Sequence, residues 1–106
     1  MKKIIALTAG LLIVASGNVI ADETLAKKSG CFACHAIDKK IVGPGWKDIA
    51  VRYKGDAGAR DALIKKVKTG GKGNWTEVTK GVPMPPYSPR VKDADIATLV
   101  DFILKL

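Results

Sequence analysis

The most constraining feature of the sequence is a five-residue run, Cys31-Phe32-Ala33-Cys34-His35. It contains both cysteines and the only histidine of the 106-residue chain. Two thiols three positions apart share one turn of backbone and can reach the same flat ligand, with an imidazole directly after them. The pattern C-x-x-C-H is typical of covalent haem attachment, in which each cysteine forms a thioether and the histidine binds the iron.

Other interpretations of this motif stay open at this point. A C-x-x-C pair also occurs in thioredoxin-like redox proteins, although no strand–helix–strand pattern surrounds it here. Half of a zinc site would need a carboxylate ligand, because the chain has no third cysteine and no second histidine. The cysteines can also be small buried apolar residues. A disulfide between them would close only a tiny loop and stabilise the fold little.

The first 21 residues have the pattern of a secretory signal peptide. Residues 1–3 are positively charged, residues 4–15 form an apolar stretch of 12 residues, and residues 19–21 read VIA, a small-residue cleavage site. The apolar stretch is shorter than the about 20 residues that a membrane-spanning helix needs. An uncleaved helix is the alternative, but the segment is not amphipathic. We therefore expect residues 1–21 to be removed and residues 22–106 to form one exported domain.

Cleavage changes the charge and the size of the domain. The full chain has 18 Lys and Arg against 10 Asp and Glu, a net charge of +8, and the 85 residues left after cleavage carry +6. This balance excludes an acidic, self-solvating tail and leaves nucleic acid, an anionic membrane or an acidic protein as partner. A domain of this size is marginally stable alone, which favours a covalent cofactor as part of its core.

The spacing of apolar residues predicts an all-α domain of three to five helices. Helices are expected over about residues 23–29, 46–53 and 56–68. The clearest helix spans residues 93–106, where one stripe is made by Ile96, Leu99, Val100 and Ile103. Residues 74–90 have no helical or strand period and hold four of the five prolines, which predicts an extended loop.

Met84 is the candidate for the second axial ligand of a haem iron. Two histidine ligands are impossible within one chain, and Met84 is the only methionine that remains after cleavage. It lies in the stretch VPMPP, 49 residues after His35. The prolines reduce the entropy lost when this loop is fixed, and a methionine among them is a poor core residue, which is the other interpretation. Ligation by histidine and methionine is typical of high-potential electron transfer.

Two further contacts with a haem are expected from the residues. The imidazole nitrogen that does not bind iron should donate to a carbonyl, which Pro44 or a neighbour in the turn at residues 43–45 can present. The indole N–H of Trp75 or Trp46, or a lysine or arginine, can bond a haem propionate. For Trp46, packing in the core is at least as good an interpretation.

The whole of residues 22–106 resembles the short bacterial class I monohaem cytochromes c. The resemblance rests on the stretches LAKKSGCFACHAIDKKIVGPGWKDIA, GGKGNW, VPMPP and DADIATLVDFILKL. It implies the class I cytochrome c fold, with helices wrapped around one covalently bound haem and the first helix crossing the last. It also implies that Gly30 gives room to Phe102 and Leu99 at this crossing.

The same resemblance implies a role for individual residues. Thioethers would form at Cys31 and Cys34, and the axial ligands would be His35 and Met84. The carbonyl of Pro44 would face the histidine, and Trp75 would lie near a propionate. The sequence departs from the family pattern twice, because TEVTKGVP makes the stretch before Met84 longer, and because Tyr87 stands where the family often has an Asn that donates to the methionine sulfur.

The implied function is that of a periplasmic electron carrier and not of an enzyme. The implied donor is a cytochrome complex, and the acceptor is a nitrite reductase, terminal oxidase or peroxidase. We expect these partners to dock through acidic surfaces, steered by basic residues around the haem. The candidates are Lys39, Lys40, Lys47, Lys54, Lys72, Lys80 and Arg90. A monomer is expected, with no stable membrane anchor and no nucleic acid partner.

Two rival functions belong to other classes of protein. A haem peroxidase or gas sensor would require displacement of Met84 and usually a distal His or Arg, and the sequence has no spare histidine. A DNA-binding module would explain the positive charge, but no basic helix with base-reading residues is evident.

Overall fold

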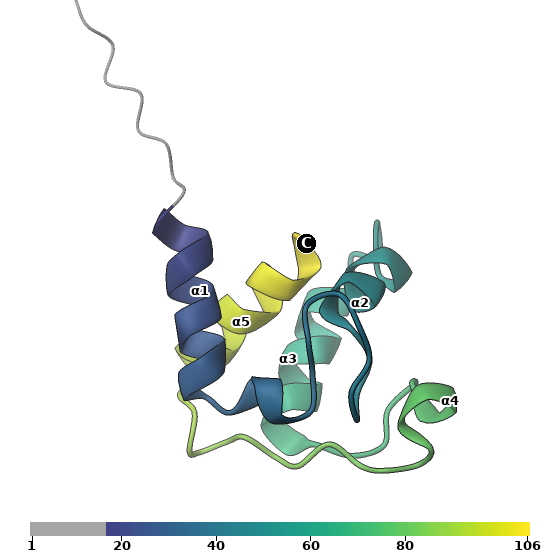
Figure 1. The fold of residues 1–106 in the computed structure, drawn as a ribbon. Helices are drawn as coiled ribbons and strands as arrows, with labels where there is room; N and C mark the ends of the chain where they lie inside the picture. Colours follow the sequence, from purple (N-terminus) through teal and green to yellow (C-terminus); the bar gives the residue numbers. More distant parts are fainter. Residues whose placement is uncertain (1–16) are drawn as a thin grey trace, which may run out of the picture.

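The computed structural model describes residues 17–106 (Figure 1), so the charged and apolar parts of the expected signal segment lie outside the described residues. The elements in chain order are α1 (Gly17–Lys28), the 3-10 turn η1 (Cys31–Ala33), α2 (Trp46–Arg52), α3 (Ala59–Thr69), α4 (Thr76–Thr79) and α5 (Asp93–Leu104). This part of the chain forms no sheet; two isolated bridges pair His35 with Lys40 and Gly71 with Met84. The all-α prediction is confirmed. Within residues 17–106 no helix is both long and apolar enough to cross a membrane.

Helices α1 and α5 lie across each other and form one part of the core (Figure 1). Ala26 of α1 is fully buried and clusters with Leu99, Phe102 and Ile103 of α5. A small side chain at this point allows the two helix backbones to approach closely. The expected crossing of the first and last helices is confirmed.

The first helix is longer than the sequence analysis predicts. It begins at Gly17 instead of near residue 23, so it runs through the expected cleavage site. No glycine or proline interrupts residues 18–28, and local sequence therefore allows the helix to extend in this direction.

The role implied for Gly30 is wrong. A Cβ at Gly30 would meet no atom within 4 Å, so this glycine gives no room to Phe102 or Leu99. Its backbone φ is 83°, a left-handed conformation that side chains with a Cβ rarely adopt and that commonly follows the end of a helix. Gly30 therefore turns the chain from α1 into η1, and Ala26 is the small residue at the helix crossing.

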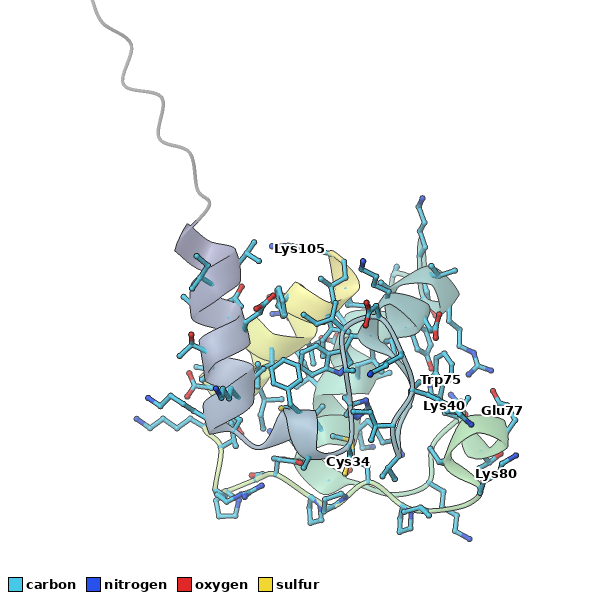
Figure 2. All side chains as sticks on the ribbon, in the orientation of Figure 1. Cys34, Lys40, Trp75, Glu77, Lys80 and Lys105 are labelled. Carbon is cyan, nitrogen blue, oxygen red and sulfur yellow. The ribbon has the colours of Figure 1, made fainter. Side chains whose placement is uncertain are left out.

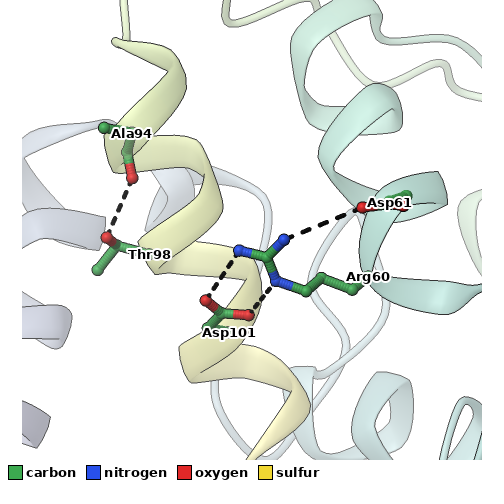
Figure 3. A network of polar contacts seen from close by, with 5 residues as sticks. All are labelled: Arg60, Asp61, Ala94, Thr98 and Asp101. Atoms are coloured by element: carbon green, nitrogen blue, oxygen red, sulfur yellow. Dashed lines mark hydrogen bonds and ion pairs between the residues drawn. The ribbon is translucent and has the colours of Figure 1, made fainter. Parts of the chain in front are cut away.

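Arg60, near the start of α3, ties that helix to α5 (Figure 3). Its Nε donates to Asp101 Oδ1 at 2.7 Å and its Nη2 donates to Asp101 Oδ2 at 3.2 Å. Asp61 lies 3.9 Å away on the other side of the guanidinium. The hydrogen bond from Arg60 lowers the pKa of Asp101. On the same face of α5, the Thr98 hydroxyl donates to the carbonyl of Ala94 at 3.0 Å.

A second apolar cluster lies where the proline-rich stretch passes α3 and α5. It contains Tyr87, Val91 and Ile96, and Met84 packs against it. The extended path expected for residues 74–90 needs one correction, because α4 forms a single helical turn within them. Four residues are too few to show a helical period in the sequence.

Candidate functional site

A cavity of about 570 Å³ lies between α2, α3, α5 and the loops that join them. Its lining contains every site residue predicted from the sequence, namely Cys31, Cys34, His35, Pro44, Trp75 and Met84. Apolar side chains such as Leu63, Val67 and Leu99 make up much of the remaining wall. A cavity of this volume, apolar with a few polar groups, is of the kind that holds a cofactor.

The turn η1 brings the two cysteines to the same wall of this cavity. The backbone N–H groups of Cys34 and His35 donate to the Cys31 carbonyl at 3.3 and 3.1 Å. Both thiols are free and half-buried, and both residues line the cavity (Cys34 is labelled in Figure 2). Burial raises the pKa of the Cys31 thiol, which therefore stays protonated at neutral pH. Two such thiols on one turn match the donor pair that covalent haem attachment requires.

The orientation of His35 is set by Pro44. Its Nδ1 lies 2.8 Å from the Pro44 carbonyl oxygen. Because a carbonyl can only accept, this bond requires the proton on Nδ1 and leaves a lone pair on Nε2. Burial lowers the pKa of His35, and the hydrogen bond to Pro44 opposes this effect. The imidazole is therefore neutral at pH 7, which is the form that binds a metal.

Met84 is held at the cavity by backbone pairing with Gly71. The Gly71 N–H donates to the Met84 carbonyl at 2.9 Å, and the Met84 N–H donates to the Gly71 carbonyl at 3.0 Å. The neighbouring Gly70 has a φ of 72°, and a Cβ there would collide with the Met84 carbonyl and the backbone of the two prolines that follow. The glycine-rich turn and the proline-rich stretch thus fit together closely and place a thioether in the wall.

Trp75 and Trp46 occupy different environments. Trp75 is half-buried and lines the cavity beside Asn74. Trp46 is only 2 % exposed and packs edge-to-face against Phe102, with ring centroids 6.1 Å apart. The structure therefore confirms that Trp46 packs in the core, and the residue also lines the cavity.

Lys66 is a site residue that the sequence analysis does not single out. It is half-buried, lines the cavity, and its Nζ lies 3.4 Å from the Gly70 carbonyl. Its position was available from the spacing, because Lys66 follows Leu63 by three residues and so shares the inward face of α3. The sequence analysis does not select Lys66 because a charged lysine on a helix is usually exposed to solvent.

The basic residues expected around the haem are on the surface. Each of the seven is exposed: Lys39, Lys40, Lys47, Lys54, Lys72, Lys80 and Arg90. In Figure 2, Lys40 and Lys80 lie on the side of the molecule that carries α4, whereas Lys105 lies at the far end of α5. Among residues 17–106, no group of three or more His, Cys, Asp or Glu side chains is placed to hold a metal ion, so the zinc interpretation gains no support.

The donor set at the cavity fits a covalent haem. It consists of two thiols, a neutral imidazole whose Nε2 carries the lone pair, and a thioether from a separate segment. Thiols supply the covalent attachment, and nitrogen and thioether sulfur are established axial ligands of haem iron.

Comparisons with known proteins agree with this geometry. The family model for cytochrome c matches residues 20–106. Cytochrome c-551 of Allochromatium vinosum is 51% identical to this chain, over 84% of it and 89% of the relative. The crystal structure of Nitrosomonas europaea cytochrome c552 has a TM-score of 0.71 at 44% identity, covering 79% of this chain and 98% of its own. The class 1 cytochrome MtoD of Sideroxydans lithotrophicus has a TM-score of 0.68 at 34% identity, covering 82% and 94%. The chain therefore belongs to the cytochrome c family, with the class I fold, one covalent haem c and the role of an electron carrier.

Proposed function

We propose that this protein shuttles single electrons between redox proteins of the periplasm and is not an enzyme. One observation carries the proposal: the only histidine and the only methionine of residues 22–106 both line the cavity that holds the two cysteines. When bound, the haem supplies an iron that cycles between its ferric and ferrous states. If both side chains bind the iron, they would leave no coordination site for a substrate, which favours electron transfer over catalysis.

Each residue at the cavity has a distinct part in this proposal. Cys31 and Cys34 would form the two thioethers that hold the haem, and His35 and Met84 would supply the nitrogen and sulfur ligands of its iron. The Pro44 carbonyl accepts the Nδ1 proton of His35 at 2.8 Å, which keeps the lone pair on the nitrogen that binds iron. The thioether ligand and the apolar wall both favour the ferrous state, because neither stabilises the extra positive charge of ferric iron.

Trp75 and Lys66 are proposed to hold a haem propionate. Both line the cavity, and they supply an indole N–H and an ammonium group, respectively. A carboxylate near an apolar wall needs such partners, because an unpaired charge that leaves water is costly.

Export with cleavage of residues 1–21 is a further part of the proposal. Val19 and Ile20 are 52% and 70% exposed, whereas the contacts of α1 with the core are made by Leu25 and Ala26. Of the residues that the structure describes, cleavage would therefore remove only the start of α1, where Val19 and Ile20 are exposed, and none that belongs to the core clusters. N-terminal sequencing of the protein from a periplasmic extract should begin at Asp22, and a cytoplasmic protein that retains Met1 would contradict the proposal.

The proposed binding of Met84 to the haem iron is tested by comparing the Met84→Ala variant with the wild-type holoprotein. The ferric wild type should show the far-red band of methionine bound to iron, and the variant should lose this band and have a lower reduction potential. Val51→Ala is the control, because it also truncates an apolar side chain but Val51 is 76% exposed and does not line the cavity. An unchanged potential in Met84→Ala would refute the axial assignment. Absence of the band from the wild type would favour an open iron and hence a peroxidase or sensor.

The partners are proposed to have acidic docking surfaces, with a cytochrome complex as donor and a nitrite reductase, terminal oxidase or peroxidase as acceptor. The protein is proposed to act as a monomer and not to bind nucleic acid. The exposed basic residues would steer the encounter, so the bimolecular rate should fall as ionic strength rises. Lys40→Glu with Lys80→Glu should slow the reaction more than the equal charge change Lys27→Glu with Lys105→Glu. Rates that do not depend on ionic strength would contradict steering.

A further inference from the structure

We propose that Arg52 is a positioning residue for the haem carboxylate site, because it fixes the indole ring of Trp75 at the cavity rim. This inference rests on the propionate role proposed above for Trp75. Arg52 is the last residue of α2 and is not among the residues that line the cavity, whereas Asn74 and Trp75 are. It therefore acts on the site through Trp75 and not by its own contact with the cofactor.

The Arg52 guanidinium contacts the Trp75 segment in three ways. Its central carbon lies 4.0 Å from the centroid of the Trp75 ring, a cation–π stack. Its Nη1 donates to the Asn74 carbonyl at 2.9 Å. The same nitrogen lies 3.5 Å from Glu77 Oε1. One side chain thus holds the residue before Trp75, the ring of Trp75 itself and the first turn of α4.

Local structure alone would leave Trp75 poorly fixed. The approach to it is a glycine-rich turn, with a φ of 111° at Gly71 and 63° at Gly73. The element after it, α4, is a single turn, and a helix this short is unstable without tertiary contacts. The carbonyl of Trp75 accepts hydrogen bonds from the N–H groups of Val78 and Thr79, with N···O distances of 2.9 Å, so the backbone of the tryptophan is joined to α4. Trp75 also packs against the apolar cluster that contains Ile49 of α2, and Arg52 adds the polar contact that anchors this segment to α2.

The chemistry of the contact favours arginine over lysine. A planar guanidinium can stack on an aromatic face and donate hydrogen bonds in its own plane at the same time, whereas an ammonium group does one or the other. Glu77 is the weakest of the three partners, because its side chain is 61% exposed and water screens the ion pair. The stack on Trp75 and the bond to Asn74 therefore define the position of the ring.

The test uses the exchange of the indole N–H groups of the ferrous holoprotein, measured by ¹⁵N NMR. In the wild type the Trp75 indole N–H should be protected from solvent by its bond to the propionate. Arg52→Met keeps an apolar stem of similar length and should accelerate exchange at Trp75 at least tenfold, while exchange at the buried Trp46 stays unchanged. Arg52→Lys should restore only part of the protection. Arg60→Met is the matched control, because it removes another exposed arginine that pairs with a carboxylate.

The outcomes separate this inference from the function on which it rests. An unprotected Trp75 N–H in the wild type would refute the propionate role of Trp75 and with it the role of Arg52. Protection in the wild type that persists within twofold in Arg52→Met would overturn the positioning role alone. Equal acceleration at Trp46, or the same effect in Arg60→Met, would show a general loosening of the fold and would also overturn the inference.

Discussion

Gly43 is the position where one added methyl group would perturb the histidine geometry most directly. A Cβ there would lie 2.5 Å from Cε1 of His35 and 3.0 Å from each ring nitrogen, whereas ordinary contacts are 3.4–4 Å. The ring would have to move by about 1 Å to relieve the closest contact. The backbone φ of Gly43 is not in the left-handed region, so Gly43→Ala introduces a steric conflict and no backbone strain.

The size of the effect follows from the contacts of the ring. The imidazole ring of His35 cannot move away without cost, because its Nδ1 is hydrogen-bonded to the carbonyl oxygen of Pro44 at 2.8 Å. Pro44 directly follows Gly43 in the chain. Overpacking a tight site by a methyl group costs about 1–3 kcal/mol, and breaking the hydrogen bond adds about 0.5–1.5 kcal/mol. Gly43→Ala should therefore lower the free energy of unfolding by about 2–4 kcal/mol, which lowers Tm by roughly 10–25 °C in a domain of this size.

Thermal unfolding of the ferric holoprotein, followed by haem absorbance, measures this difference. Val51→Ala is the control, because Val51 is 76% exposed and does not line the cavity that would hold the haem. This control should stay within about 1 kcal/mol of the wild type. A Gly43→Ala protein with a Tm within about 2 °C of the wild type would refute the view that the imidazole, the turn and the Pro44 carbonyl are packed as one rigid unit.

Three further predictions concern other parts of the fold. Gly70→Ala should cost more than about 2 kcal/mol in urea unfolding and weaken the far-red band, because its φ is 72° and its Cβ would collide with the Met84 carbonyl. Ala26→Leu should cost about 1–3 kcal/mol in the same assay, because Ala26 is 0% exposed between α1 and α5. The hydrogen bond from Arg60 lowers the pKa of Asp101 in the folded protein. The ion pair therefore stabilises the fold above a pH of about 4, the pKa of an unperturbed aspartate, and this stabilisation is lost as the pH falls through the lowered pKa. Wild type should therefore be more stable than Asp101→Asn at pH 6, and the difference should shrink progressively below pH 4.

The helices that the sequence predicts well are those with a strong apolar period. Helix α2 (Trp46–Arg52) falls within the predicted range 46–53, and α5 (Asp93–Leu104) falls within 93–106. Their apolar faces are read directly from spacing, because burial of one face requires that spacing. Helix α4 has no such face and depends on tertiary contacts, so the sequence alone does not predict it.

The residues of the candidate site also differ in how well the sequence predicts them. The cysteines and the histidine are adjacent in the sequence, so their proximity at the cavity follows from local geometry. Met84 could be assigned to the same site by elimination, because it is the only methionine outside the expected signal segment and the chain has no second histidine. Arg52 could not, because its position depends on how α2 packs against a glycine-rich loop. For Lys66 the spacing from Leu63 gives the inward face of α3, but its charge favours a solvent-exposed interpretation. The sequence analysis selects Gly30 as a structurally important glycine. Only the structure shows that the position requires glycine for its backbone φ of 83° and not for the space its small size leaves.

The two apolar clusters explain why cofactor binding and stability are linked in this chain. Trp46, Ile49 and Leu99 of the first cluster and Tyr87 of the second all line the same cavity. A covalent haem there would contact both clusters and join them into one core, which a small domain needs. Substitutions at the shared wall should therefore change stability and reduction potential together. Arg52 lies outside both clusters and outside the wall, so its replacement should change the carboxylate site with little effect on the free energy of unfolding.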